Sequence, residues 1–365
     1  MYPLNAWYAA AWDAEVGRAP LARTICERPL VLYRAADGRA VALADACWHR
    51  LVPLSMGRVD GDDLVCGYHG LGFGRDGRCT RMPAQETLNP SAAVRSYPVV
   101  ERHRFVWIWP GDPSLADPAL VPDLHWNDDP EWTGDGETIH LDCDYRLVLD
   151  NLMDLTHEQF LHAGSLASQE LSDCEPEVEH GDRHVTLTRW MLGIDAPPFL
   201  GMQLARKDPG HTGPVDRWQV IRFEAPATIA IDVGVAPKGS GAPEGDRSAG
   251  INGYVLNTVT PSAAGACHYF WAFVRNYHLG DQGLTTLLRN SVSRVFREDT
   301  AMLNAQQRAI EANPDHEFYN LNIDAGGMWV RRVIDAQVAV EQGRERAHPS
   351  ELTAVAAGTR RPSGC

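Results

Sequence analysis

The chain has 365 residues, of which 44% are hydrophobic, 22% charged and 8% aromatic, a composition typical of a folded globular protein. A chain of this length predicts about two domains. Its 33 basic and 48 acidic residues give a net charge of −15, which argues against nonspecific binding to nucleic acid or anionic lipid. Since it also lacks a membrane-length apolar run and a basic leader, we expect a cytoplasmic protein that binds neither nucleic acid nor membrane.

The first part of the chain reads as short strands and turns. Asp37-Gly38 predicts a hairpin turn between two apolar strands, and the polar residues 101–104 separate two more apolar runs. A proline-rich stretch then interrupts the strand pattern. We therefore predict an all-β domain over residues 1–112 and a linker over residues 113–123.

The second part mixes helical and strand patterns. Residues 145–158 and 284–310 have helical apolar periodicity, whereas residues 216–237 and 253–276 read as strands. We therefore predict an α+β domain over residues 124–345. Residues 346–365 lose the apolar periodicity and are expected to form a mobile tail. The predicted fold class of the whole chain is α+β.

Two cysteine–histidine motifs lie in the all-β part, C-W-H at residues 47–49 and C-G-Y-H at residues 66–69. Such mixed pairs suit a [2Fe-2S] cluster in which two cysteines bind one iron and two histidines bind the other. A structural zinc site is the alternative, although zinc modules usually pair cysteine with cysteine and histidine with histidine. The pattern favours a Rieske centre held by Cys47, His49, Cys66 and His69.

A second set of candidate metal ligands begins with His157 and His162. On one continuous helix these residues would point about 140° apart, and they do not have the H-E-x-x-H spacing of zinc proteases. If the helix ends or distorts between them, both rings can converge on one metal. A distant carboxylate would then complete the two-histidine, one-carboxylate set typical of non-heme Fe(II) oxygenases.

Asp299 is the favoured carboxylate, because helical periodicity places it on the apolar face of residues 284–310. Glu298 lies nearer the edge of that face and is the alternative, which we expect to be solvated or salt-bridged. Asp154, three residues before His157, is expected to accept a hydrogen bond from the non-ligating ring nitrogen of that histidine. Local helix capping is the other interpretation of Asp154.

Together these features resemble the Rieske non-heme iron aromatic ring oxygenase family, most closely its vanillate O-demethylase oxygenase group. The similar segments are residues 1–8, 65–71, 106–112, 143–158 and 321–327. The resemblance implies a Rieske [2Fe-2S] domain followed by a catalytic domain with a helix-grip-like antiparallel sheet. It also implies that Cys47 and Cys66 bind one cluster iron, that His49 and His69 bind the other, and that His157, His162 and Asp299 bind mononuclear Fe(II).

The same resemblance implies a head-to-tail homotrimer in which catalytic Asp154 links an iron histidine to a cluster histidine of the neighbouring subunit. The chain departs from the family at Trp48, where proline is common, and at Leu51-Val52, where smaller residues often occur. These changes remove no ligand. They are expected to alter the exposure of the cluster, its potential or the surface that docks the reductase.

The activity implied is that of the oxygenase component of a two-component monooxygenase. It would O-demethylate a methoxybenzoate, foremost vanillate to protocatechuate and formaldehyde, with O2 and electrons from a separate NADH-dependent reductase that carries FMN and a plant-type 2Fe-2S domain. The alternatives are another methoxyarene or the methyl group of an aryl sulfonate, and a Rieske electron-transfer protein, which would need only the first domain. Three residues are candidate anchors for a substrate carboxylate, and the sequence does not choose between them: Arg217, Arg222 and His268.

Overall fold

The computed structural model describes residues 1–83, 85–162 and 176–344. The predicted tail, residues 346–365, lies outside them. The chain divides into two compact units, which we call unit 1 (Met1–Asp123 and Val259–His268) and unit 2 (Leu124–Thr258 and Tyr269–Cys365). Within the described ranges, no helix has both the length and the hydropathy that a membrane crossing requires.

Unit 1 is built from three small antiparallel sheets, as the all-β prediction required. The strands of the three sheets, each in spatial order, are β1 (Tyr8–Trp12), β11 (Phe105–Ile108) and β10 (Val99–Arg102); β2 (Leu21–Ile25), β3 (Arg28–Arg34), β4 (Ala40–Ala44) and β9 (Ser96–Tyr97); and β5 (Arg58–Asp60), β6 (Asp63–Val65), β7 (Gly72–Phe73) and β8 (Cys79–Arg81). Both predicted hairpins are confirmed, β3 pairing with β4 and β10 with β11. The 3-10 turns η1 (Asp13–Glu15) and η2 (Leu54–Met56) lie between strands, and η3 (Pro113–Leu115) and η4 (Pro118–Leu120) follow β11.

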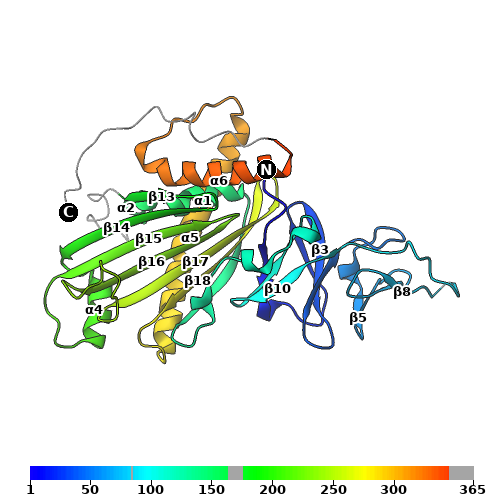
Figure 1. Cartoon of the computed structure of the whole chain (residues 1–365), viewed down its shortest axis with the longest axis horizontal. Helices are drawn as coiled ribbons and strands as arrows, with labels where there is room; N and C mark the ends of the chain where they lie inside the picture. Colours follow the sequence, from blue (N-terminus) through cyan, green and yellow to red (C-terminus); the bar gives the residue numbers. More distant parts are fainter. Residues whose placement is uncertain (84, 163–175, 345–365) are drawn as a thin grey trace. The chain divides into compact units, whose positions relative to one another are not determined.

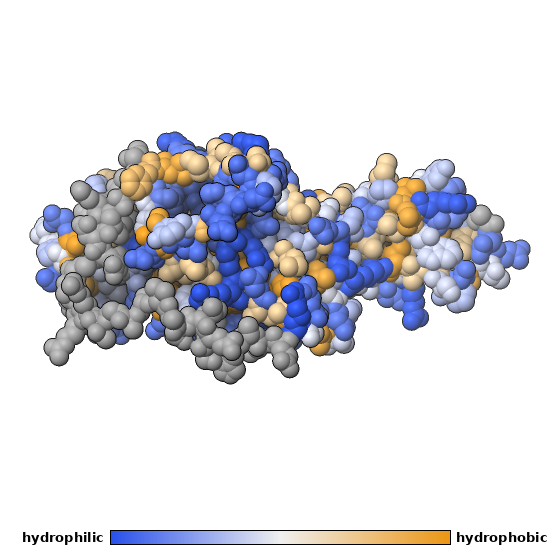
Figure 2. All heavy atoms as spheres, turned by 90° about the horizontal axis from the view of Figure 1, so that it is seen from above, coloured by the Kyte–Doolittle hydropathy of each residue, from blue (hydrophilic) through white to orange (hydrophobic). Residues whose placement is uncertain are grey.

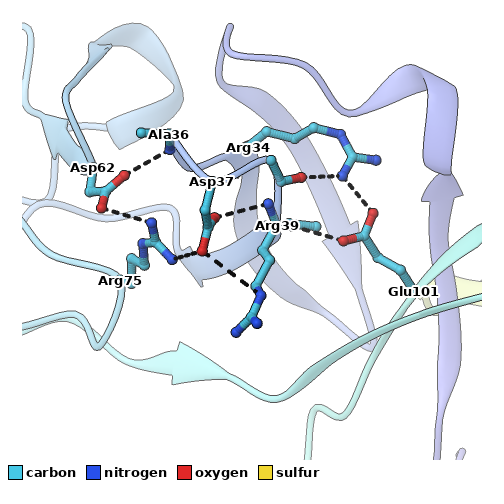
Figure 3. A network of polar contacts seen from close by, with 9 residues as sticks. Arg34, Ala36, Asp37, Arg39, Asp62, Arg75 and Glu101 are labelled. Carbon is cyan, nitrogen blue, oxygen red and sulfur yellow. Dashed lines mark hydrogen bonds and ion pairs between the residues drawn. The ribbon is translucent and has the colours of Figure 1, made fainter.

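A network of ion pairs joins the turns of unit 1 (Figure 3). Arg75 bridges two carboxylates, Asp37 of the β3–β4 turn and Asp62 of the β5–β6 turn, at 2.7 Å each. The hydrogen bond from Arg75 lowers the pKa of Asp37, and the backbone N–H of Ala36, which donates to Asp62 at 2.7 Å, lowers the pKa of that carboxyl. These contacts join the two hairpins between which the first cysteine–histidine loop lies in the sequence.

The Val259–His268 part of unit 1 is the end of a long hairpin. The backbone N–H groups of Cys26 and Glu27 each donate to a carbonyl of this hairpin at 2.8 Å, and the Thr260 hydroxyl donates to the Ala9 carbonyl at 2.7 Å. The ring of His268 contacts the Thr24 carbonyl at 3.1 Å. His268 is therefore held by backbone of unit 1.

Unit 2 contains an antiparallel sheet of seven strands among its described residues (Figure 1). In spatial order they are β12 (Thr133–Leu141), β18 (Ala266–Arg275), β17 (Ile251–Ala263), β16 (Thr228–Pro237), β15 (Val215–Glu224), β14 (His184–Ile194) and β13 (Glu177–His180). The first strand in sequence thus pairs with the last. Strand alternation gives β15 one face with Arg217, Gln219 and Ile221 and an opposite face with Trp218 and Arg222.

Helices and short 3-10 turns surround this sheet: α1 (Tyr145–Met153), α2 (Glu158–Leu161), α4 (Pro198–Lys207), α5 (Gln282–Ala312), α6 (Ala325–Glu341), η5 (His125–Asn127), η6 (Leu155–His157) and η7 (Asn322–Asp324). Figure 1 shows α5 crossing one sheet face, and α6 alongside α1 near β13 and β14. Arg331 of α6 binds Asp150 of α1 through Nε at 3.0 Å, and Gly327 lets the two helices approach closely. These contacts fix α1, which leads directly into the two candidate histidines.

Helix α5 covers one face of the sheet, and its core contacts show which face this is. Asp281 caps it by accepting from the Leu284 N–H at 2.9 Å, a contact that contributes about 1 kcal/mol. Leu284 and Leu288 pack with Val235 and Ile251 of the sheet, so the face that carries Val235 is the one that α5 covers. Arg217 pairs with Val235 and therefore lies on the same face. On the surface drawn in Figure 2, hydrophobic residues form small patches separated by hydrophilic ones.

Candidate metal centres

The segment that carries the two histidines is not one helix but three short pieces. Helix α1 ends at Met153 because Asp154 is extended (φ −129°, ψ 105°), which corrects the expectation of a helix reaching residue 158. The Asp154 carboxylate accepts from the Thr156 N–H at 2.9 Å and from the Thr156 hydroxyl at 3.0 Å. The new turn begins there, so the capping interpretation of Asp154 describes its contacts within the chain.

His157 and His162 stand at the two ends of the single-turn helix α2. His162 has left helical geometry (φ −110°, ψ 28°), and this departure lets its ring approach His157. The ring centroids lie 5.4 Å apart at 75°. Distortion of the helix thus brings together two side chains that a continuous helix would have separated.

Asp299 of α5 lies between the two rings. Its Oδ1 is 3.5 Å from His157 Nε2 and 3.2 Å from His162 Nε2, and one ligand atom from each residue lies within 4.8 Å of the others. Burial raises the pKa of Asp299, whereas the two histidines and Asn151 oppose that rise. Because a buried carboxylate requires a cationic partner, this donor set fits a metal ion of the class held by two histidines and one carboxylate.

The outer nitrogen of each ring is also held. His162 is only 1% exposed on its side chain, and its Nδ1 donates to Glu298 Oε2 at 2.7 Å. His157 Nδ1 donates to the backbone carbonyl of Asp154 at 2.5 Å. Such contacts orient a metal-binding imidazole and fix its tautomer, leaving Nε2 for the ion.

These contacts correct the expectation for Asp154 and agree with one of the two expectations for Glu298. The bond from His157 goes to the carbonyl of Asp154 rather than to its carboxylate, because the carboxylate is turned toward Thr156. For Glu298 the salt-bridged alternative holds, because its Oε2 lies 2.7 Å from His162 Nδ1 and accepts from it. Its position beside Asp299 was the available sequence signal, and only the fold shows which ring it reaches.

Asn151 is a site residue that sequence reasoning missed. Its side-chain Nδ2 donates to Asp299 Oδ1 at 3.1 Å and lies 3.4 Å from His157 Nε2. The available signal was its place in the last turn of α1, on the helix that precedes the two histidines. Asn151 therefore helps to orient the Asp299 carboxylate.

The walls near Asp299 are aromatic. Tyr269 and Trp271 of β18 both pack on Phe296, one helical turn before Asp299, with ring centroids at 5.2 Å. Trp271 is fully buried. Trp218 of β15 lies on the opposite sheet face, where its Nε1 donates to Asp232 at 2.8 Å. Two aromatic residues of β18 thus contribute to this region, and Trp218 does not.

The two cysteine–histidine loops of unit 1 have the same construction. In each, the cysteine N–H and C=O bond to residues five and four positions later, Cys47 with Val52 and Leu51, and Cys66 with Leu71 and Gly70. The fourth residue after each cysteine has a positive φ, 59° at Leu51 and 73° at Gly70. Leu51 thus occupies a conformation that glycine adopts more easily.

The four predicted cluster ligands form an inner and an outer pair. Cys47 and Cys66 are each 2% exposed and contact one another through their side chains, whereas the rings of His49 and His69 are exposed with centroids 4.7 Å apart. Burial raises the pKa of the Cys47 thiol, and N–H groups of the same loop donate to its sulfur. Paired sulfurs inside and paired imidazoles outside fit the donor set of a Rieske cluster.

Residues around the loops are close-packed on one side and exposed on the other. A Cβ on Gly57 would lie 2.0 Å from the Val65 carbonyl oxygen, and one on Gly67 would lie 2.8 Å from the Met56 carbonyl oxygen. The turn η2 therefore supports the second loop through direct backbone contact. Trp48 is 41% exposed, so its bulk adds to the surface beside His49 rather than to the core.

Comparison with known proteins identifies both units. Residues 6–98 match the Rieske [2Fe-2S] domain, and residues 141–339 match the vanillate O-demethylase oxygenase C-terminal domain. The chain is 42% identical to the vanillate O-demethylase oxygenase subunit of Pseudomonas sp. (strain HR199 / DSM 7063), over 94% of this chain and 96% of that protein. It is 37% identical to the toluene-4-sulfonate monooxygenase system iron-sulfur subunit TsaM1 of Comamonas testosteroni, over 94% of this chain and 99% of that protein.

The fold also matches a solved structure. Dicamba monooxygenase with non-heme iron and dicamba superimposes with a TM-score of 0.81 at 35% identity, covering 93% of this chain and 98% of that one. The α+β prediction, with a Rieske domain ahead of a catalytic domain, is thereby confirmed. The chain belongs to the Rieske non-heme iron oxygenases of the vanillate O-demethylase oxygenase family.

Proposed function

We propose that this oxygenase O-demethylates a methoxylated benzoate, with vanillate as the foremost substrate and protocatechuate as its product. The reaction consumes one methoxyarene, O2, two electrons and two protons, and yields one phenol, formaldehyde and water. The similarity to vanillate O-demethylase oxygenase subunits over almost the whole chain supports this choice. Relatives named for toluene-4-sulfonate and dicamba make aryl-sulfonate methyl groups and other methoxyarenes the alternatives.

The observation that carries the oxygenase mechanism is the convergence of His157, His162 and Asp299. We assign these residues to mononuclear Fe(II), and Cys47, Cys66, His49 and His69 to the cluster. When bound, the cluster supplies single electrons and the mononuclear iron supplies O2 activation. A Rieske electron carrier without oxygenase activity would have no use for this buried set of donors.

The residues around the donors keep them in one geometry. Glu298 and the Asp154 carbonyl hold the outer ring nitrogens, and Asn151 holds the Asp299 carboxylate. Preorganised ligands need not rearrange when substrate binds. Trp271 and Phe296 exclude water from one side of the site, which favours reaction of a bound aromatic ring over wasteful reduction of O2.

Partners follow from the same proposal. Relatives are named as oxygenase subunits or components, which implies a separate reductase. We assign to that reductase the NADH, FMN and plant-type 2Fe-2S groups for which this chain has no motif. We also propose a head-to-tail homotrimer in which Asp154 accepts from His157 through its carbonyl and contacts a cluster histidine of the neighbouring subunit through its carboxylate.

The test is a turnover assay with a substrate panel. Purified protein, reductase, NADH and O2 are incubated with vanillate, other methoxybenzoates and 4-toluenesulfonate, and formaldehyde and phenol are quantified. Vanillate-dependent formaldehyde, in a one-to-one ratio with protocatechuate, is the expected result. Brisk turnover of another panel member without vanillate turnover would refute the assignment. Iron content unchanged by His157→Ala would refute the mononuclear site.

A further inference from the structure

Two arginines lie on the sheet face that carries the mononuclear metal site. The register of β14 and β15 pairs Arg189 with Gln219 and Met191 with Arg217, so Arg189, Gln219 and Arg217 share one face in adjacent rows. Arg189 and Gln219 are 7% and 5% exposed, and Arg189 Nη1 donates to Gln219 Oε1 at 2.9 Å. One guanidinium is thus held by a buried amide, and Arg217 lies one row away on the same face of the sheet.

This pair is within electrostatic range of the histidine-bearing helix. Burial raises the pKa of Glu158, the residue after His157, to about 7, and the positive charges of Arg217 and Arg189 oppose that rise. His162 and Asp299 act on the same carboxyl group. The two arginines, Glu158 and the metal-site residues are therefore close enough for their charges to act on one another.

We propose that Arg217 and Arg189 form the anion-binding end of the substrate site and receive the acidic group of an aromatic acid, a carboxylate or a sulfonate. Gln219 holds Arg189 in place for this role. The inference rests on the proposed function and deepens it, because it names the chemical feature that a substrate must carry. A planar guanidinium suits the task, since it donates two parallel hydrogen bonds to a pair of acidic oxygens.

The other two candidate anchors are placed elsewhere. Arg222 lies on β15 five residues after Arg217, which puts it on the opposite face, and it is exposed. The ring of His268 contacts the Thr24 carbonyl within unit 1. Neither residue shares the face that α5 covers, so Arg217 is the one of the three that can meet a ring bound beside Asp299.

Equilibrium binding tests the inference without relying on turnover. Calorimetry on the iron-loaded protein measures Kd for 3-methoxybenzoate, 4-toluenesulfonate and the uncharged analogue guaiacol, in wild type and in Arg217→Gln, Arg217→Lys and Arg222→Gln. Losing a charge-assisted bidentate contact predicts about 10- to 100-fold weaker binding of whichever anion is the ligand in Arg217→Gln. Guaiacol binding should change less than about twofold, Arg217→Lys should recover part of the loss, and Arg222→Gln should match wild type.

The contrary results distinguish failure of the proposed anchor from failure of the proposed substrate. Equal weakening of anions and guaiacol, wild-type anion affinity in Arg217→Gln, or the same effect in Arg222→Gln would overturn the inference. Cluster absorbance and melting temperature report whether the variant is folded. If wild type shows no vanillate-dependent formaldehyde yet Arg217→Gln selectively loses anions, the proposed substrate fails and the anchor stands. The carboxylate and sulfonate arms then tell which acid is preferred.

Discussion

Replacing Glu298 tests whether a carboxylate that is not itself a metal ligand affects the affinity of the site for Fe(II). The His162 ring that donates to Glu298 at 2.7 Å is almost fully buried, so no water can replace this contact easily. A hydrogen bond to a charged group contributes about 1.5–3 kcal/mol. Because Glu298 is 38% exposed on its side chain, solvent screening favours the lower end of this range.

These values predict the effect of two substitutions. Glu298→Gln keeps an acceptor but removes the charge, which should weaken Fe(II) binding by about threefold to tenfold. Glu298→Ala removes the acceptor as well and should weaken it by about 10- to 100-fold, the usual effect of losing a partner of a metal-bound histidine. Turnover at limiting Fe(II) should fall in the same order.

The assay is anaerobic competition between iron-depleted protein and a chromophoric Fe(II) chelator. The visible absorbance of the cluster reports that unit 1 is intact in every sample. Glu311→Gln is the matched control, because it makes the same charge change on an exposed residue of α5. Fe(II) affinity of Glu298→Ala within twofold of wild type would refute the orienting role.

Three further substitutions test other parts of the chain. Asp154→Asn should keep the cluster absorbance and melting temperature, because asparagine also caps turns, but lose at least about tenfold in coupled turnover; full turnover would contradict the proposed bridge. Gly57→Ala places a methyl group 2.0 Å from the Val65 carbonyl oxygen and should lower the free energy of unfolding of unit 1 by about 1–3 kcal/mol in urea. Gly17→Ala, where a Cβ has nothing within 4 Å, should change that free energy by less than about 0.5 kcal/mol. Equal effects of the two substitutions would refute the steric argument. Arg75→Gln should lower the urea midpoint at pH 6, and the loss should shrink progressively below about pH 4. The reason is that Asp37 and Asp62, whose pKa values are lowered in the fold, stabilise it above their unfolded pKa and lose that effect as pH falls through the folded pKa. A constant difference in midpoint down to about pH 2 would contradict this.

Local sequence determined the donor types and much of the local structure. The paired cysteine–histidine motifs lie within loops of six residues closed by their own backbone, so their spacing alone indicated the cluster. The apolar stripe of α5 placed Asp299 on the buried face, because helical periodicity depends only on neighbours along the chain. The hairpins of unit 1 were predictable for the same reason, since a turn and two alternating strands are local features.

Tertiary structure decided which side chains meet. The break at Asp154 turns its carboxylate toward Thr156 and its carbonyl toward His157, which the helical apolar pattern of this segment did not indicate. The choice of Glu298 as the partner of His162 depends on two helices distant in sequence. Both faces of β15 carry buried side chains, so alternation alone could not assign Arg217 or Arg222 to the site; the placement of α5 over one face did.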